Sequence, residues 1–135
     1  MSTLKLTRFE TCDYALMSQD NKLSLIGLFD RIFIQKLPAQ HPSMSFVVAA
    51  VGKTKSDYTI NFIIKNPSGN KINEIVMHVK TNDAGQINII TNLSNLPITE
   101  QGIFTIECYE GDVKIGSKEL IVSNVPTFQS GKTKN

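Results

Sequence analysis

The chain has 135 residues, of which 41% are hydrophobic, and its 14 Lys and Arg residues exceed its 12 Asp and Glu residues to give a formal net charge of +2. This length is typical of one domain, and this apolar content excludes a disordered chain. The small net charge gives no electrostatic basis for binding nucleic acid or an acidic membrane surface, and no run approaches the ~18 apolar residues of a membrane helix. We expect one soluble domain over residues 1–125 and a frayed tail over residues 126–135, with neither nucleic acid nor membrane as a partner.

The first predicted elements are two strands separated by a polar turn. Residues 18–21, Ser-Gln-Asp-Asn, separate an N-terminal strand from a second strand over residues 22–26. The stretch 37–42, Leu-Pro-Ala-Gln-His-Pro, is predicted to be a loop, because its two prolines fix an extended backbone. A stiff loop loses little entropy on binding, so this loop is a candidate contact surface.

The segment 45–51, Ser-Phe-Val-Val-Ala-Ala-Val, is apolar on both faces and too short to favour a helix. We interpret it as a strand covered on both sides, or as a strand whose second face meets another domain or another chain. Val47 lies opposite Phe46 and Val48 in the pleat. Val47 is therefore the candidate partner contact, and self-association through it is one expectation.

From residue 58 onward, apolar and polar residues alternate as in strands with one core face and one solvent face. In the segment 58–65 the apolar face carries Tyr58, Ile60, Phe62 and Ile64. The same alternation recurs over residues 74–80, 86–89, 104–109 and 119–123. His78 falls on the polar face of its segment.

Turn signals separate these strands. Pro and Gly in the segment 66–70, and Gly in the segments 82–85 and 110–112, are typical of hairpin connections. Pro97 predicts that residues 92–97 form a longer connection rather than a continuing strand. Strands at this spacing, without a long helical period, predict an all-β fold, namely an antiparallel β-sandwich of about eight or nine strands.

Cys12 and Asp13 form the first pair of residues suited to chemistry. A nucleophilic Cys needs a nearby base, and the chain offers only His41 and His78. The alternative is a half-buried free thiol, with Asp13 capping or pinning a turn. His41 is either a ligand group on the proline-stiffened loop or a solvated loop residue.

Asp30 precedes the alternating residues Ile32 and Ile34. If those two face the core, Asp30 points the same way and needs a hydrogen-bond partner or a cation. It is then either a structural Asp that accepts backbone N–H groups at a corner, or half of a metal or ligand site with Asp13 or Asp20.

Other chemistry lacks its sequence signal. The chain contains no phosphate-binding loop, zinc-protease, EF-hand or GxSxG pattern. It has no Trp, and Tyr14, Tyr109 and Phe29 are the candidate exposed aromatics. Two lone cysteines without CxxC spacing make a poor metal or redox motif. No apolar run of signal-peptide length follows the N-terminus, so we expect a cytoplasmic protein with reduced cysteines, no cofactor and no metal.

Several short motifs carry a family resemblance. They are the pair Cys12-Asp13, the KLxxxG pattern at residues 22–27, the FDxI pattern at residues 29–32, and the proline-rich link that follows. In this order they resemble a family of uncharacterised bacterial proteins of about 130 residues. Residues 101–106 and 113–116 look like the last hairpin of an immunoglobulin-like sandwich. The resemblance implies an immunoglobulin-like β-sandwich and supplies no activity.

Three classes of function are compatible with these sequence features. The preferred one is a non-catalytic binding or assembly module with a protein partner. The second is a small enzyme, or a metal- or ligand-binding protein, with a site near Cys12, Asp13, Asp30 and His41. The third is a structural subunit of a larger particle. An enzyme of this kind needs a concave pocket with perturbed pKa values, whereas a binding module needs an apolar patch or an open sheet edge.

Overall fold

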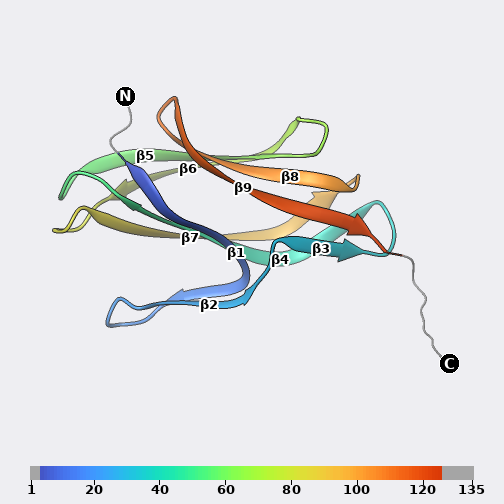
Figure 1. Cartoon of the computed structure of the whole chain (residues 1–135), viewed down its shortest axis with the longest axis horizontal. Coiled ribbons are helices and arrows are strands. Elements are labelled where there is room, and N and C mark those ends of the chain that lie inside the picture. Colours follow the sequence, from blue (N-terminus) through green and yellow to red (C-terminus); the bar gives the residue numbers. More distant parts are fainter. Residues whose placement is uncertain (1–3, 126–135) are drawn as a thin grey trace.

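The computed structural model describes residues 4–125, which form nine strands and no helix (Figure 1). The expected tail over residues 126–135 lies outside the described residues. The strands are β1 (Lys5–Met17), β2 (Leu23–Leu28), β3 (Arg31–Ile34), β4 (Ala39–Val51), β5 (Asp57–Lys65), β6 (Lys71–Lys80), β7 (Gln86–Ile98), β8 (Gly102–Glu110) and β9 (Val113–Asn124).

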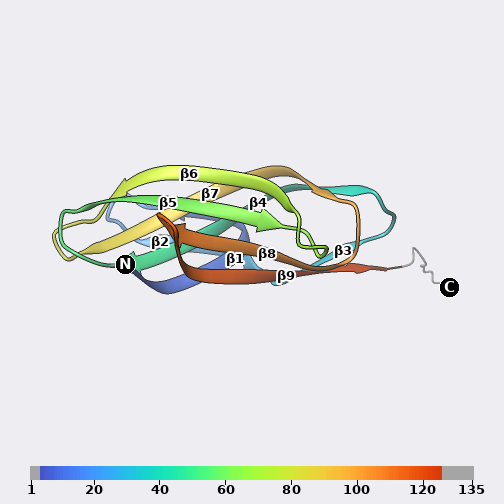
Figure 2. The same ribbon diagram turned by 90° about the horizontal axis from the view of Figure 1, so that it is seen from above.

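The strands form two sheets that pack face to face. One sheet has four strands in the order β2-β1-β4-β7, and the other has five in the order β3-β9-β8-β5-β6. Neighbouring strands are antiparallel except β3 and β9, which pair in parallel. Figure 2 shows β6, β5, β8 and β9 side by side, with β6 at one border of its sheet.

Strands β4 to β9 follow the immunoglobulin order. β4 and β7 are neighbours in one sheet, as strands B and E are, and β5, β8 and β9 are neighbours in the other, as strands C, F and G are. β6 lies beside β5 in the position of strand C′. The prediction of an all-β, immunoglobulin-like sandwich with eight or nine strands is confirmed.

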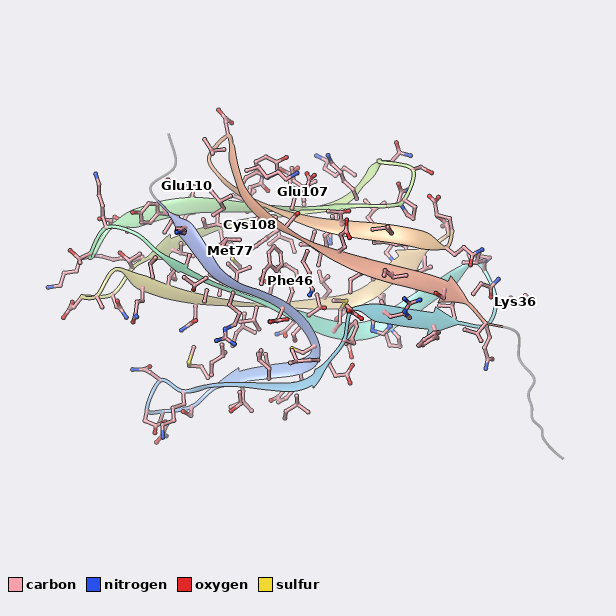
Figure 3. The ribbon with its side chains drawn as sticks, in the orientation of Figure 1. Lys36, Phe46, Met77, Glu107, Cys108 and Glu110 are labelled. Atoms are coloured by element: carbon pink, nitrogen blue, oxygen red, sulfur yellow. The ribbon has the colours of Figure 1, made fainter. Side chains whose placement is uncertain are left out.

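The core lies between the sheets and is centred on aromatic rings. Phe46 of β4 and Phe62 of β5 meet edge to face with ring centroids 4.8 Å apart, and Phe46 lies between the two sheets in Figure 3. Cys108 of β8 lies directly opposite Phe62 in the strand register. The alternation predicted for residues 58–65 holds, since its four even-numbered side chains are all buried.

Two expectations about prolines are wrong. β4 already begins at Ala39, so most of the expected loop 37–42 is strand, with His41 paired to Leu96. β7 continues through Pro97, which pairs with Gln40. β7 is the edge of its sheet, where a missing N–H can face away from the ladder.

Strand β1 bends at the residue where it changes its pairing partner. β1 pairs with β4 from Lys5 to Cys12 and with β2 from Cys12 to Met17, so Cys12 is the point where β1 changes partners. Cys12 and Ala15 pack in the same small cluster although they are three residues apart, whereas a flat strand would turn their side chains to opposite faces. Opposite the bend, Gly27 has a φ of 71°. The hairpin of residues 12–28 thereby lies across the outer side of the four-stranded sheet (Figure 1).

Candidate functional site

Cys12 lies at the base of the β1–β2 hairpin, opposite Leu28, and has no exposed surface. It packs with Ala15 and Val47 in a small second core, which Leu23 and Leu25 border from β2. Burial raises the pKa of the Cys12 thiol, and the negative charge of Asp13 adds to this effect. A nucleophilic Cys needs the opposite shift, so the environment of Cys12 is that of an inert buried thiol.

His41 lies within electrostatic range of Asp13, near the base of the hairpin. His41 is half-buried, and its ring packs on Phe29 with centroids 5.8 Å apart. Burial lowers the pKa of the His41 imidazole, and the charge of Asp13 acts in the opposite sense. The buried Nε2 atom of His41 has no hydrogen-bond partner among the residues that the structure describes. His41 is therefore a packed strand residue rather than a group held out on a loop.

Asp30 does not point inward, which corrects the sequence prediction. It is exposed, although Ile32 and Ile34 are buried as expected. The strand begins only at Arg31, so the alternation does not extend back to Asp30. The backbone carbonyl of Asp30 accepts a 2.9 Å hydrogen bond from Ile121 N–H. Within residues 4–125, no group of three His, Cys, Asp or Glu side chains is placed to hold a metal ion.

Val47 does not face another chain, which corrects the second sequence prediction. Its side chain has no exposed surface. The hairpin of this same chain covers it through Cys12 and Ala15, and Ile90 of β7 borders the cluster. The segment 45–51 is apolar on both faces because the bent β1 adds a third layer at this point.

The outer face of the hairpin carries an exposed apolar surface, which we call the hairpin patch and define as Tyr14, Ile26 and Leu28. Tyr14 and Ile26 are cross-strand partners. The three side chains are 55%, 55% and 60% exposed, respectively. On the inner face Leu23 and Leu25 are half-buried. The Leu-Ser-Leu-Ile-Gly-Leu sequence of β2 is the signal for this patch, because it places apolar residues on both faces of a strand.

The outer face of the five-stranded sheet carries a buried ion-pair network on β8, beside exposed apolar side chains such as Val76 on β6. Glu107 of β8, labelled in Figure 3, is buried there. It forms ion pairs of 3.2 Å with Lys65 and 3.3 Å with Lys114. Tyr109 donates a 3.0 Å hydrogen bond to the same carboxylate. Burial by itself would raise the pKa of Glu107, but these three partners outweigh it and hold the pKa below its usual range. This network stabilises the sheet face and pairs the charge of Glu107 with those of Lys65 and Lys114.

A shallow hollow of about 600 Å³ lies at the end of the sandwich, between the β4–β5 loop and the β8–β9 hairpin. Its lining includes Lys53, Asp57 and Asp112. In the immunoglobulin order this is the end that carries the B–C and F–G loops. Its mixed charges do not define one class of ligand.

The fold and these sites define an immunoglobulin-type β-sandwich with an added hairpin. The chain belongs to the family of unknown function DUF6941, whose model matches residues 8–123. The resemblance to an uncharacterised family is thereby confirmed. No functionally curated protein matches the chain.

Solved structures share the fold at low sequence identity. The C-terminal domain of wzt matches with a TM-score of 0.56 and 10% identity, over 100% of this chain and 86% of that one. The alkylpurine DNA glycosylase AlkC of Pseudomonas fluorescens matches with a TM-score of 0.53 and 8% identity, over 90% of this chain and 30% of that one. An immunoglobulin-like protein of Pseudomonas aeruginosa is 12% identical, with a TM-score of 0.48, over 90% of this chain and 98% of that one. The first two likenesses show the fold alone. The described residues also include no helix suited to crossing a membrane.

Proposed function

We propose that the protein is a non-catalytic binding module that contacts a protein partner through the hairpin patch. The observation that carries this proposal is the exposure of Tyr14, Ile26 and Leu28 on one hairpin, each at more than half of its surface. Neighbouring large apolar side chains on the outside of a domain mark interaction surfaces. Tyr14 adds a ring with a polar tip, a side chain enriched at protein interfaces.

The environment of the candidate catalytic residues supports a binding role over the alternative enzyme. Cys12 is inaccessible and its thiol pKa is raised, while His41 is packed against Phe29. Asp13 and Asp30 are exposed. The two free, buried cysteines are consistent with a reducing compartment and support the proposal of a cytoplasmic location.

The test compares partner capture by matched variants in the native host. Ile26→Asp places a charge in the centre of the hairpin patch, whereas Val113→Asp places the same charge on an exposed valine at the start of β9. We expect one partner to be captured by wild type and Val113→Asp and lost from Ile26→Asp. The purified partner should then bind with the same ranking.

Thermal melts of both variants must match wild type, because Ile26 is exposed and contributes little to the core. Equal capture by Ile26→Asp and wild type would contradict the proposed surface.

A further inference from the structure

β6 is an edge strand whose outer side is open. Among residues 4–125, β5 is its sole ladder partner. Natural proteins protect such edges with prolines, bulges or inward-pointing charges. β6 has a lysine at each end and an irregular register between Lys71 and Asn73, but residues 74–79, Glu-Ile-Val-Met-His-Val, contain no proline, bulge or inward-pointing charge. Their inward side chains Ile75, Met77 and Val79 pack against the core yet stay partly exposed, so a further strand would complete their burial.

The other sheet edges are less suited to pairing. β3 has only four residues. β2 is interrupted by Gly27, whose φ is 71°. In β7, the positive φ of Asn95 and the missing N–H of Pro97 break the far half, and Met17 and Asn21 of the hairpin flank the near end. β6 is therefore the edge best prepared to accept another strand.

We propose that β6 pairs antiparallel with β6 of a second copy about a two-fold axis at Val76, which joins two five-stranded sheets into one. Directly opposed residues of an antiparallel pair share one face of the sheet, so the axis must pass through a residue. With the axis at Val76, Glu74 lies opposite His78 of the partner subunit, and Ile75 lies opposite Met77 of the partner subunit. The two copies of Val76, each 57% exposed in the single chain, cover one another.

Over residues 74–78 this register sets polar side chains against polar ones and apolar side chains against apolar ones. Moving the axis to Met77 would set Val76 against an imidazole, and moving it to Ile75 would set Glu74 against Val76. Only the axis at Val76 opposes apolar to apolar and carboxylate to imidazole on the outer face. Such self-complementarity is what a closed two-fold dimer requires.

The single chain already holds Glu74 and His78 in position. The Glu74 carboxylate accepts hydrogen bonds of 2.6 Å from Lys71 and 2.7 Å from Asn61, and each of its oxygens keeps a further acceptor site. His78 Nδ1 lies 3.2 Å from Thr59 Oγ1. When Thr59 donates to Nδ1, Nε2 carries the proton and can donate to the partner's Glu74. Little side-chain entropy is then lost on pairing.

Sedimentation velocity over a range of micromolar concentrations tests the proposal. We expect wild type to be a dimer and Val76→Lys, which opposes two ammonium groups at the axis, to raise the dissociation constant roughly tenfold or more. Val113→Lys is the matched control and should stay a dimer. Wild type that remains a monomer at the highest concentration would overturn the proposal, as would dissociation of Val113→Lys to the same extent.

Two further experiments test the strand register. Neither requires that the Val76→Lys variant folds. His78→Glu should dissociate the dimer by opposing two carboxylates, and adding Glu74→Lys to it should restore association. Val76→Cys should form an intermolecular disulfide under mild oxidation, whereas the inward Met77→Cys should not. A dimer that survives His78→Glu, or that cross-links through Met77→Cys instead, would refute this pairing. The hairpin patch lies on other strands, so neither result bears on the proposed function.

Discussion

The ring of Phe62 meets the ring of Phe46 edge to face, and this contact joins the centres of the two sheets. Phe9 of β1 packs on both rings, with centroids 6.1 Å from Phe46 and 6.4 Å from Phe62. The three rings therefore connect β1, β4 and β5. Immunoglobulin domains place a buried Trp and an inter-sheet disulfide in this region, whereas this chain uses aromatic packing and a free Cys108.

Replacing Phe62 by Ala should therefore cost about 3–5 kcal/mol of unfolding free energy, since it removes a side chain with no exposed surface. Thr59→Ala, on the solvent face of the same strand, should cost far less. Denaturant midpoints of the two variants measure the difference. Equal losses would show that the strand faces are assigned in reverse.

Gly27→Ala should destabilise the protein by about 1–2 kcal/mol from its positive φ alone. An added Cβ would also overlap the carboxylate of Asp13. Gly69→Ala is the matched control, because its φ is also positive but nothing lies within 4 Å of the added Cβ. We expect Gly27→Ala to melt at a lower temperature than Gly69→Ala, and Asp13→Ala to remove most of that gap. No gap between the two glycine variants would mean that the bend tolerates a side chain.

Glu107→Gln should make stability less dependent on pH in the acid range. The pKa of Glu107 is lower in the folded protein than in the unfolded chain, so the carboxylate contributes stability at neutral pH. That contribution begins to fall near the unfolded pKa of about 4.3 and is lost as the pH passes through the folded value. Urea unfolding at a series of pH values should show wild type and Glu107→Gln converging as the pH falls. A constant difference between the two curves would exclude Glu107 as the source.

Neither cysteine should react in the folded protein. Burial raises the pKa of Cys108 to about 12, and Cys12 is also buried with a raised pKa. A thiol reagent at mildly alkaline pH should label no site in native protein and both sites after unfolding, as intact mass would show. Rapid labelling of native protein, or a mass two units below the reduced form, would contradict this assignment.

The sequence predicts what depends on local alternation. The buried face of the segment 58–65 can be predicted because successive side chains of a strand point to opposite faces of the sheet. Pro97 is different, since its effect depends on whether the strand lies at an edge, and edge position is a property of the whole sheet. The alternation of Ile32 and Ile34 predicts the wrong face for Asp30, because β3 begins only at Arg31.

The covering of Val47 could not be predicted for a related reason. It requires that β1 bend at Cys12 and carry β2 back across the sheet, and the marks of this bend, Asp13 and Gly27, look like ordinary turn residues in the sequence. The same bend places the hairpin patch on the outside of the molecule. The location of this patch could therefore not be predicted from the sequence either.

The parallel pairing of β3 with β9 has a consequence for how the protein is made. Arg31 pairs with Ile121, and Ile34 pairs with Asn124, so the first third of the chain is joined to its last strand. Synthesis runs from the N-terminus, and until β9 emerges both β3 and the free edge of β8 lack a partner among the strands described here. A nascent chain that stalls after β8 would therefore expose two open edges at once, at the stage when unpaired strands are most prone to aggregate. The five-stranded sheet is thus completed only when the twelve residues of β9 have been made and have paired with both β3 and β8.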